Sequence, residues 1–95
     1  MADPEPHFIL FYDFVDNIVE RRAAHREAHM AEIRAAKDDG RITISGPLGD
    51  PPHGAAIVFK DRSAAEGFPE TDPYVKAGLV TNWRVDVWTV AQGGG

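Results

Sequence analysis

Apolar residues recur along this chain with two different periods, one typical of strands and one typical of helices. Residues 7–12 form a continuous apolar and aromatic run, which predicts a strand buried on both faces. From residue 18 to about residue 39 the apolar positions follow the helical period, and Asn17 with Glu20 resembles a capping box at the start. Gly40 is placed to end this helix in a left-handed cap.

Three further segments read as strands. Residues 41–45 alternate between apolar and polar side chains, as a half-buried strand does. Residues 46–54 contain so many glycines and prolines that we expect a loop there. Residues 55–60 return as a third strand, and residues 79–90 alternate again as the last one.

A second helical region lies between the last two strands. Ser63 with Glu66 forms another capping box, which predicts the start of a short helix. We expect Gly67 and Pro69 to interrupt it, because proline removes a backbone donor and glycine weakens a helix. The pair formed by Asp72 and Pro73 then predicts a new helical turn, with aspartate as the cap and proline at the first position.

The resulting order is β-α-β-β-α-β, which predicts an α+β fold of the ferredoxin-like type. In that arrangement two helices cover one face of a four-stranded antiparallel sheet and leave the other face bare. The first strand carries Phe8, Leu10 and Tyr12 on one side but also Ile9 and Phe11 on the other. A bare apolar face is rare on a soluble monomer. We therefore expect a homodimer whose two sheets face each other and enclose a barrel-like space, a dimeric α+β barrel.

The length, net charge and composition of the chain limit the kinds of partner and the location that we expect. The 95 residues suffice for one domain, expected at residues 7–91 between a flexible leader (1–6) and a flexible tail (92–95). The net charge of −5 without any basic run argues against nucleic acid or an anionic membrane as a partner. The chain has no cysteine, no targeting segment and no membrane-length apolar stretch, so we expect a cytoplasmic protein.

The candidate chemistry lies on one stripe of the first predicted helix. On a helical wheel Arg22, Arg26 and His29 fall in the same narrow sector as Ile18 and Ile33. Two guanidinium groups and an imidazole that point toward a core are costly unless they are paired or meet a ligand. This stripe is therefore where we predict the functional site.

Three separated motifs resemble those of the YciI-like, or YCII-related, family. They are Arg22-x3-Arg26-x2-His29, then Gly40-x5-Gly46-Pro47, and finally Asp72-Pro73-Tyr74-x3-Gly78. The resemblance implies a ferredoxin-like dimeric α+β barrel with an active site built on a histidine and an aspartate, which correspond here to His29 and Asp72. It also implies dehydrochlorination of a chlorinated hydroxyhydroquinone in chloroaromatic breakdown as one activity of the family, and muconolactone isomerase shares the wider fold. This chain departs from the pattern in its loop at residues 51–53 and in a second helical histidine, His25.

The residues themselves suggest a cofactor-free enzyme that performs acid–base chemistry on a compact anionic ring substrate, and the resemblance implies that it is a lyase or an isomerase. His29 is the group that can exchange a proton near neutral pH, with Asp72 as its orienting carboxylate. Arg22 and Arg26 would hold the anionic part of the substrate and favour the neutral imidazole. Ser45 is a further candidate for substrate binding. Tyr74 is another candidate for substrate binding, because it belongs to the third of the motifs named above.

Each of these residues also has a structural interpretation. His29 can be a satisfied half-buried histidine, and Asp72 is explained as a helix cap. Arg22 and Arg26 can extend past the core or pair across a dimer interface. Tyr74 and Tyr12 can serve only packing. The alternative function is a dimer that binds a small anion without catalysis, or an accessory module, and an enclosed pocket would favour catalysis.

A metal site is a further alternative, which we reject. His25 and His29 have the i, i+4 spacing at which two helical histidines can chelate zinc. However, position 26 is arginine rather than the glutamate of the zinc-protease motif, and two neighbouring arginines would repel a cation. We expect no metal and no cofactor.

Overall fold

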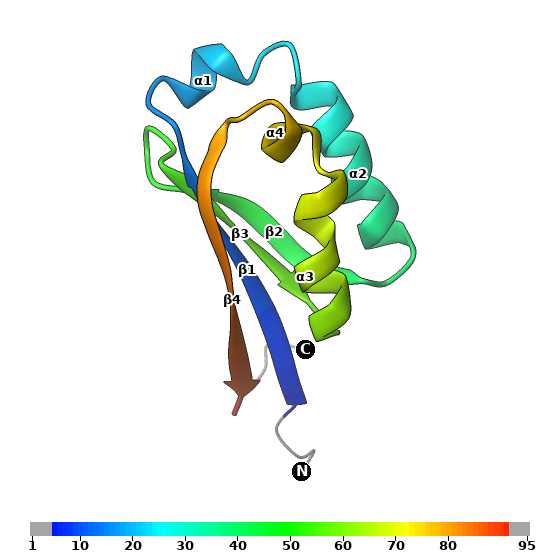
Figure 1. Ribbon diagram of the computed structural model, residues 1–95. Helices are drawn as coiled ribbons and strands as arrows, with labels where there is room; N and C mark the ends of the chain where they lie inside the picture. The colour runs from blue at the N-terminus through cyan, green and yellow to red at the C-terminus, as the bar shows by residue number, and fades with distance from the viewer. Residues whose placement is uncertain (1–4, 92–95) are drawn as a thin grey trace.

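A computed structural model describes residues 5–91 of the protein and confirms the predicted α+β, ferredoxin-like arrangement. The elements in chain order are β1 (Glu5–Phe14), α1 (Ile18–Arg21), α2 (Arg26–Asp38), β2 (Ile42–Leu48), β3 (Gly54–Phe59), α3 (Arg62–Thr71), α4 (Pro73–Lys76) and β4 (Val80–Val90). The strands form one antiparallel sheet in the order β2-β3-β1-β4. The longer helices, α2 and α3, lie side by side on one face of this sheet (Figure 1).

The hydrophobic core fills the space between the sheet and helices α2 and α3. Its buried members come from β1, α2, β2, β3 and α3: Leu10, Tyr12, Ile33, Ala36, Ile42, Ala55, Ile57, Phe59, Ala65 and Phe68. A smaller cluster of Ile18, Tyr74 and Leu79 joins α1 and α4 to the start of β4. These two clusters fix the positions of the helix ends that carry the candidate site.

The two faces of β1 are buried to different degrees within one chain. Leu10 and Tyr12 face the helices and are fully buried. Ile9 and Phe11 point to the opposite face and are only partly covered. The prediction of a strand buried on both faces is therefore wrong for the single chain, because the helices cover one side of the sheet only.

The first predicted helix is divided into two. We expected one helix over residues 18–39, but α1 ends at Arg21 and α2 begins at Arg26. In the intervening turn the amide of His25 donates a hydrogen bond to the carbonyl of Arg22. The two residues are three positions apart, which makes a tighter turn than the four-residue spacing of an α-helix. No glycine or proline marks this break. Its cause is tertiary, because Ile18 packs in the smaller cluster with Tyr74 whereas α2 packs in the main core.

Neither predicted capping box forms. Asn17 has a left-handed backbone with φ of 60°, and its side chain makes no capping hydrogen bond. The third helix begins one residue before Ser63, whose hydroxyl donates to Asp61 instead. This helix also continues through Pro69 to Thr71, so the expected interruption there is wrong. The cap predicted at Asp72, with Pro73 in the first turn, is confirmed, and Gly40 does adopt a left-handed conformation.

The second strand is longer than predicted. We expected a loop from residue 46, but β2 continues to Leu48 and pairs Pro47 with Ala55. Proline is tolerated because β2 is an edge strand, so no neighbouring strand needs its missing donor. The extension places the end of β2 opposite α2, where it forms part of the pocket described below.

The chain ends differ slightly from the expected domain limits. The first strand begins at Glu5, so the last two residues of the expected leader belong to a strand. The rest of that leader and the expected tail at residues 92–95 lie outside the described residues. Within residues 5–91, no helix combines the length and the apolar character needed to cross a membrane.

The buried Tyr12 predicts a specific pH dependence of stability. Burial, reinforced by the nearby Asp72 carboxylate, raises the pKa of Tyr12 far above its ordinary value of 10.0. Above pH 10 the unfolded chain releases this proton while the folded chain keeps it, so the free energy of unfolding falls as pH rises. The fall attributable to Tyr12 is about 1.4 kcal/mol per pH unit. Urea unfolding between pH 9 and 11.5 should show this extra slope in the wild type and not in Tyr12→Phe; parallel curves would contradict it.

Candidate active site

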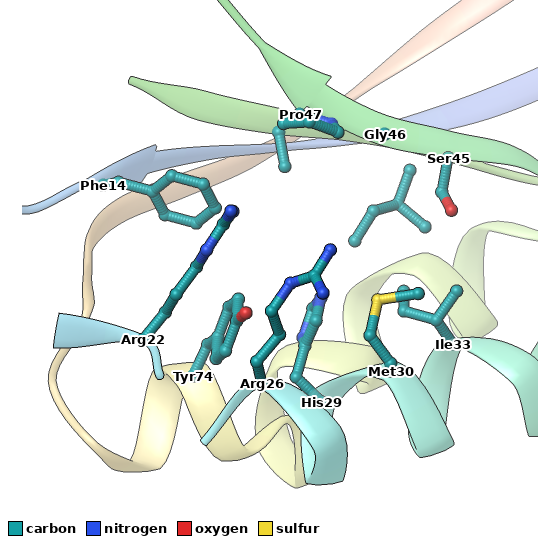
Figure 2. Close-up of a pocket in the computed structure, with 12 residues that line it drawn as sticks. Phe14, Arg22, Arg26, His29, Met30, Ile33, Ser45, Gly46, Pro47 and Tyr74 are labelled. Atoms are coloured by element: carbon teal, nitrogen blue, oxygen red, sulfur yellow. The ribbon is translucent and has the colours of Figure 1, made fainter. Parts of the chain in front are cut away.

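A pocket of about 210 Å³ lies between α2 and the ends of β2 and β3 (Figure 2). Its lining residues come from five elements and the turn after α1: Phe14, Arg22, Arg26, His29, Met30, Ile33, Ser45, Gly46, Pro47, Ala55, Ile57 and Tyr74. The pocket is on the helix side of the sheet and within one chain.

His29 and Asp72 are in contact, although 43 positions separate them in the sequence. The Nδ1 atom of His29 lies 2.8 Å from Oδ1 of Asp72, and both side chains are buried. Because an ionised carboxylate can only accept, Nδ1 carries the hydrogen in this pair. In the neutral ring, Nε2 then has a free lone pair and can take up a proton.

The Asp72 carboxylate is held by donors from three parts of the fold. Besides His29 it accepts a hydrogen bond from the backbone amide of Tyr74 at 3.0 Å, as the cap of α4. Its second oxygen accepts a hydrogen bond from the Tyr12 hydroxyl at 2.8 Å. Asp72 is fully buried and stands behind His29 rather than on the pocket wall. Asp72 is therefore both a helix cap and the hydrogen-bond partner of the imidazole.

Tyr74 packs flat against His29. The two ring centroids are 3.8 Å apart and the ring planes differ by 4°. The pKa of Tyr74 is raised by burial, an effect that the positive charges of Arg22 and Arg26 partly oppose. Stacking on one side and the Asp72 hydrogen bond at Nδ1 together fix the orientation of the imidazole.

Arg22 and Arg26 supply positive charge to the pocket. Figure 2 shows both side chains extending from the helix side toward Pro47. Neither guanidinium makes an ion pair with any carboxylate of residues 5–91. Arg22 is half-buried and Arg26 is exposed at the pocket mouth. Arg22 belongs to the turn after α1 rather than to α2. The prediction that both arginines lie on one stripe of a single helix was therefore only partly right, although both line the pocket.

Apolar side chains and one hydroxyl complete the walls. Met30 and Ile33 come from α2, and Ile57 faces them from β3. Ser45 lies on β2 and its hydroxyl forms no hydrogen bond within the described part of the chain. The pocket thus offers an apolar wall and a cationic wall to a small ligand.

The hydrogen-bonding role of Tyr12 was not predicted, because the sequence pattern does not distinguish it from a tyrosine that only packs in the core. A signal existed, because a buried tyrosine hydroxyl usually has a hydrogen-bond partner. The identity of that partner depends on the sheet register and was not accessible from the pattern. His25 does not line the pocket, and no group of three or more metal-binding side chains is found among residues 5–91.

Comparison with known proteins places this chain among relatives of similar length. It is 28% identical to Protein YciI of Escherichia coli O6:H1, covering 76% of this chain and 85% of that protein. It is 29% identical to an uncharacterized protein of Haemophilus influenzae, covering 77% of this chain and 86% of the other.

A solved structure has the same fold. It is 5-chloro-2-hydroxyhydroquinone dehydrochlorinase (TftG) of Burkholderia phenoliruptrix AC1100 in complex with 2,5-dihydroxybenzoquinone, with a TM-score of 0.70 and 23% identity. The match covers 86% of this chain and 92% of the dehydrochlorinase. The profile of the YCII-related domain matches residues 6–89, nearly all of the described chain. The protein therefore belongs to the YCII-related family, as its three motifs indicated.

Proposed function

We propose that this protein is a cofactor-free enzyme that carries out acid–base chemistry on a compact anionic ring compound. The observation that carries the proposal is the buried hydrogen bond between His29 and Asp72 beside two arginines that have no ion-pair partner within residues 5–91. An engineered cavity of about 150 Å³ is known to hold benzene, so a pocket of about 210 Å³ suits one substituted ring.

Each side chain has a defined part in this chemistry. Nε2 of His29 removes a proton from a carbon next to a carbonyl group, and Asp72 stabilises the imidazolium that forms. Arg22 and Arg26 bind the substrate oxygens on which negative charge develops. Asp72 acts through the imidazole and does not itself contact the ligand.

The most concrete reaction of this kind is elimination of HCl from a chlorinated hydroxyhydroquinone. In the diketo tautomer of this ring, His29 takes a proton from the carbon next to one carbonyl group. A carbon–carbon double bond forms between that carbon and its chlorine-bearing neighbour, and chloride leaves with the electron pair of the carbon–chlorine bond, so that a hydroxyquinone remains. No oxidant or reductant is needed. Support for this substrate comes from the fold shared with the dehydrochlorinase, which was solved with 2,5-dihydroxybenzoquinone. Ser45 and Tyr74 are the proposed additional contacts of the ring.

The arginines provide the first test. We expect 2,5-dihydroxybenzoquinone to bind the wild type in isothermal titration calorimetry. Arg22→Met or Arg26→Met should raise its Kd about tenfold or more, because each removes a charge-assisted hydrogen bond. Arg34→Met is the matched control, since Arg34 lies on α2 but pairs with Glu27 outside the pocket. Equal affinities in all four proteins, or no binding to the wild type, would refute the anion site.

His29 provides the second test. Turnover of 5-chloro-2-hydroxyhydroquinone, followed by chloride release, should fall about a hundredfold or more in His29→Asn if this residue transfers the proton. Binding of 2,5-dihydroxybenzoquinone should persist in the same variant, since the arginines remain. Undiminished turnover would exclude His29 as the proton-transfer residue. Binding without any turnover by the wild type would favour the non-catalytic anion-binding alternative.

We further propose that the protein is a homodimer joined through the open face of its sheet. On this face Ile44 is 66% exposed and Trp88 is 49% exposed. Phe11 lies on the same face, with the Arg84 guanidinium 4.5 Å from the centre of its ring. Such a patch of apolar and aromatic side chains on a flat sheet is typical of an interface.

The dimer can be tested by sedimentation at micromolar concentration. The wild type should sediment as a dimer, and Ile44→Lys with Trp88→Lys as a monomer, because two lysines would be buried without partners. Val19→Lys is the control, as Val19 is similarly exposed but lies on α1. A monomeric wild type would contradict the proposal. Because the pocket lies within one chain, the monomeric variant should still bind the anion.

A further inference from the structure

Tyr12 occupies a position that the proposed chemistry does not use directly. Its ring is packed in the main core on β1, and its hydroxyl donates to Oδ2 of Asp72 at 2.8 Å. The other oxygen of Asp72 is the one that holds His29 and the amide of Tyr74. Tyr12 therefore acts on the carboxylate through the oxygen that does not bind His29, and it does not line the pocket.

The tyrosine is a fixed and permanent donor. Strand pairing holds the backbone of Tyr12 between Ala55 and Trp83, and only 1% of its surface is exposed. Because burial keeps the pKa of Tyr12 well above the ordinary range, the hydroxyl stays protonated at neutral pH. The hydroxyl of Tyr12 is thus held in place as a hydrogen-bond donor to Asp72.

The carboxylate depends on this donor because no cation neutralises it. Among the described residues Asp72 has no lysine or arginine within ion-pair distance, and its one charged partner is His29 when protonated. A buried carboxylate with fewer donors holds its charge less well and has a higher affinity for a proton. The number of donors on Asp72 therefore sets how strongly the His29–Asp72 pair attracts a proton.

We propose that Tyr12 is a positioning residue that limits the proton affinity of the His29–Asp72 pair by drawing negative charge onto the second carboxylate oxygen. A pair that held its proton too tightly would stay protonated at neutral pH and could not serve as a base. This proposal rests on the proposed function of His29, but it can be tested without a substrate.

The other groups around His29 come from several elements. They are Asp72 and Tyr74 from the α3–α4 junction and α4, Arg22 and Arg26 from the turn after α1 and from α2, and His25 one helical turn away. The two arginines oppose protonation of the imidazole by like charge. Tyr12 differs from them because it acts through the carboxylate, so its effect should disappear when Asp72 loses its charge.

The test is an NMR titration of the His29 ring in isotopically labelled protein, with its signals assigned by their loss in His29→Asn. In Tyr12→Phe we expect the midpoint of proton uptake to rise by about 0.5–1 pH unit. Phe59→Leu is the matched control, because Phe59 lies in the same core cluster but does not touch Asp72. It should lower the unfolding temperature without moving the midpoint. An unchanged midpoint in Tyr12→Phe, or an equal shift in Phe59→Leu, would overturn the proposal.

Two further proteins keep the test decisive if Tyr12→Phe is unstable. Incorporation of 3-fluorotyrosine at position 12 keeps the ring and strengthens the donor, so the midpoint should fall rather than rise. In an Asp72→Asn background the fluorinated residue should cause no shift, and a shift there would contradict the mechanism. If the midpoints move as expected while no chlorinated substrate is turned over, the role of Tyr12 stands and the proposed reaction fails.

Discussion

The site depends on one buried carboxylate and the three donors that converge on it. Asp72 caps α4, accepts from the imidazole on α2 and accepts from the phenol on β1. A buried charge of this kind is stable only when its oxygens are hydrogen-bonded. The same contacts therefore join three elements of the fold and orient the histidine. Loss of the carboxylate would affect both the packing of α4 and the direction of the imidazole.

The charge of the pocket contrasts with that of the whole chain. The protein has a formal net charge of −5, yet Arg22 and Arg26 face the pocket without an ion-pair partner in the described structure. A few fixed charges beside an apolar wall can outweigh a distant excess of the opposite sign, because the local medium screens them less than water does. A small anion that enters the pocket thus meets two positive charges, which fits the proposed ligand-binding role better than a merely structural one.

The sequence predicted the fold, and it named Asp72 as a candidate partner of His29 without establishing that the two side chains meet. The strand order follows from hydrophobic periodicity and from the glycines and prolines between elements, which act locally. The family resemblance implied a site built on these two residues, but no local rule connects residues 43 positions apart, and the structure was needed to show their contact. The break after α1 and the helical path through Pro69 were not predictable, since tertiary packing overrides propensity at both places. The partner of Tyr12 was inaccessible because it depends on the sheet register.

The stacked tyrosine has a consequence for the direction of attack. Tyr74 covers one flat side of the His29 ring at 3.8 Å, so a ligand cannot approach the imidazole from that side, and the lone pair of Nε2 lies in the plane of the ring. A hydrogen transferred by this nitrogen must lie near the plane of the ring. When the carbon that loses or gains the hydrogen has two distinguishable hydrogens, the protein would handle only one of them. Stereochemistry would then be decided by a side chain that takes no part in the bond changes.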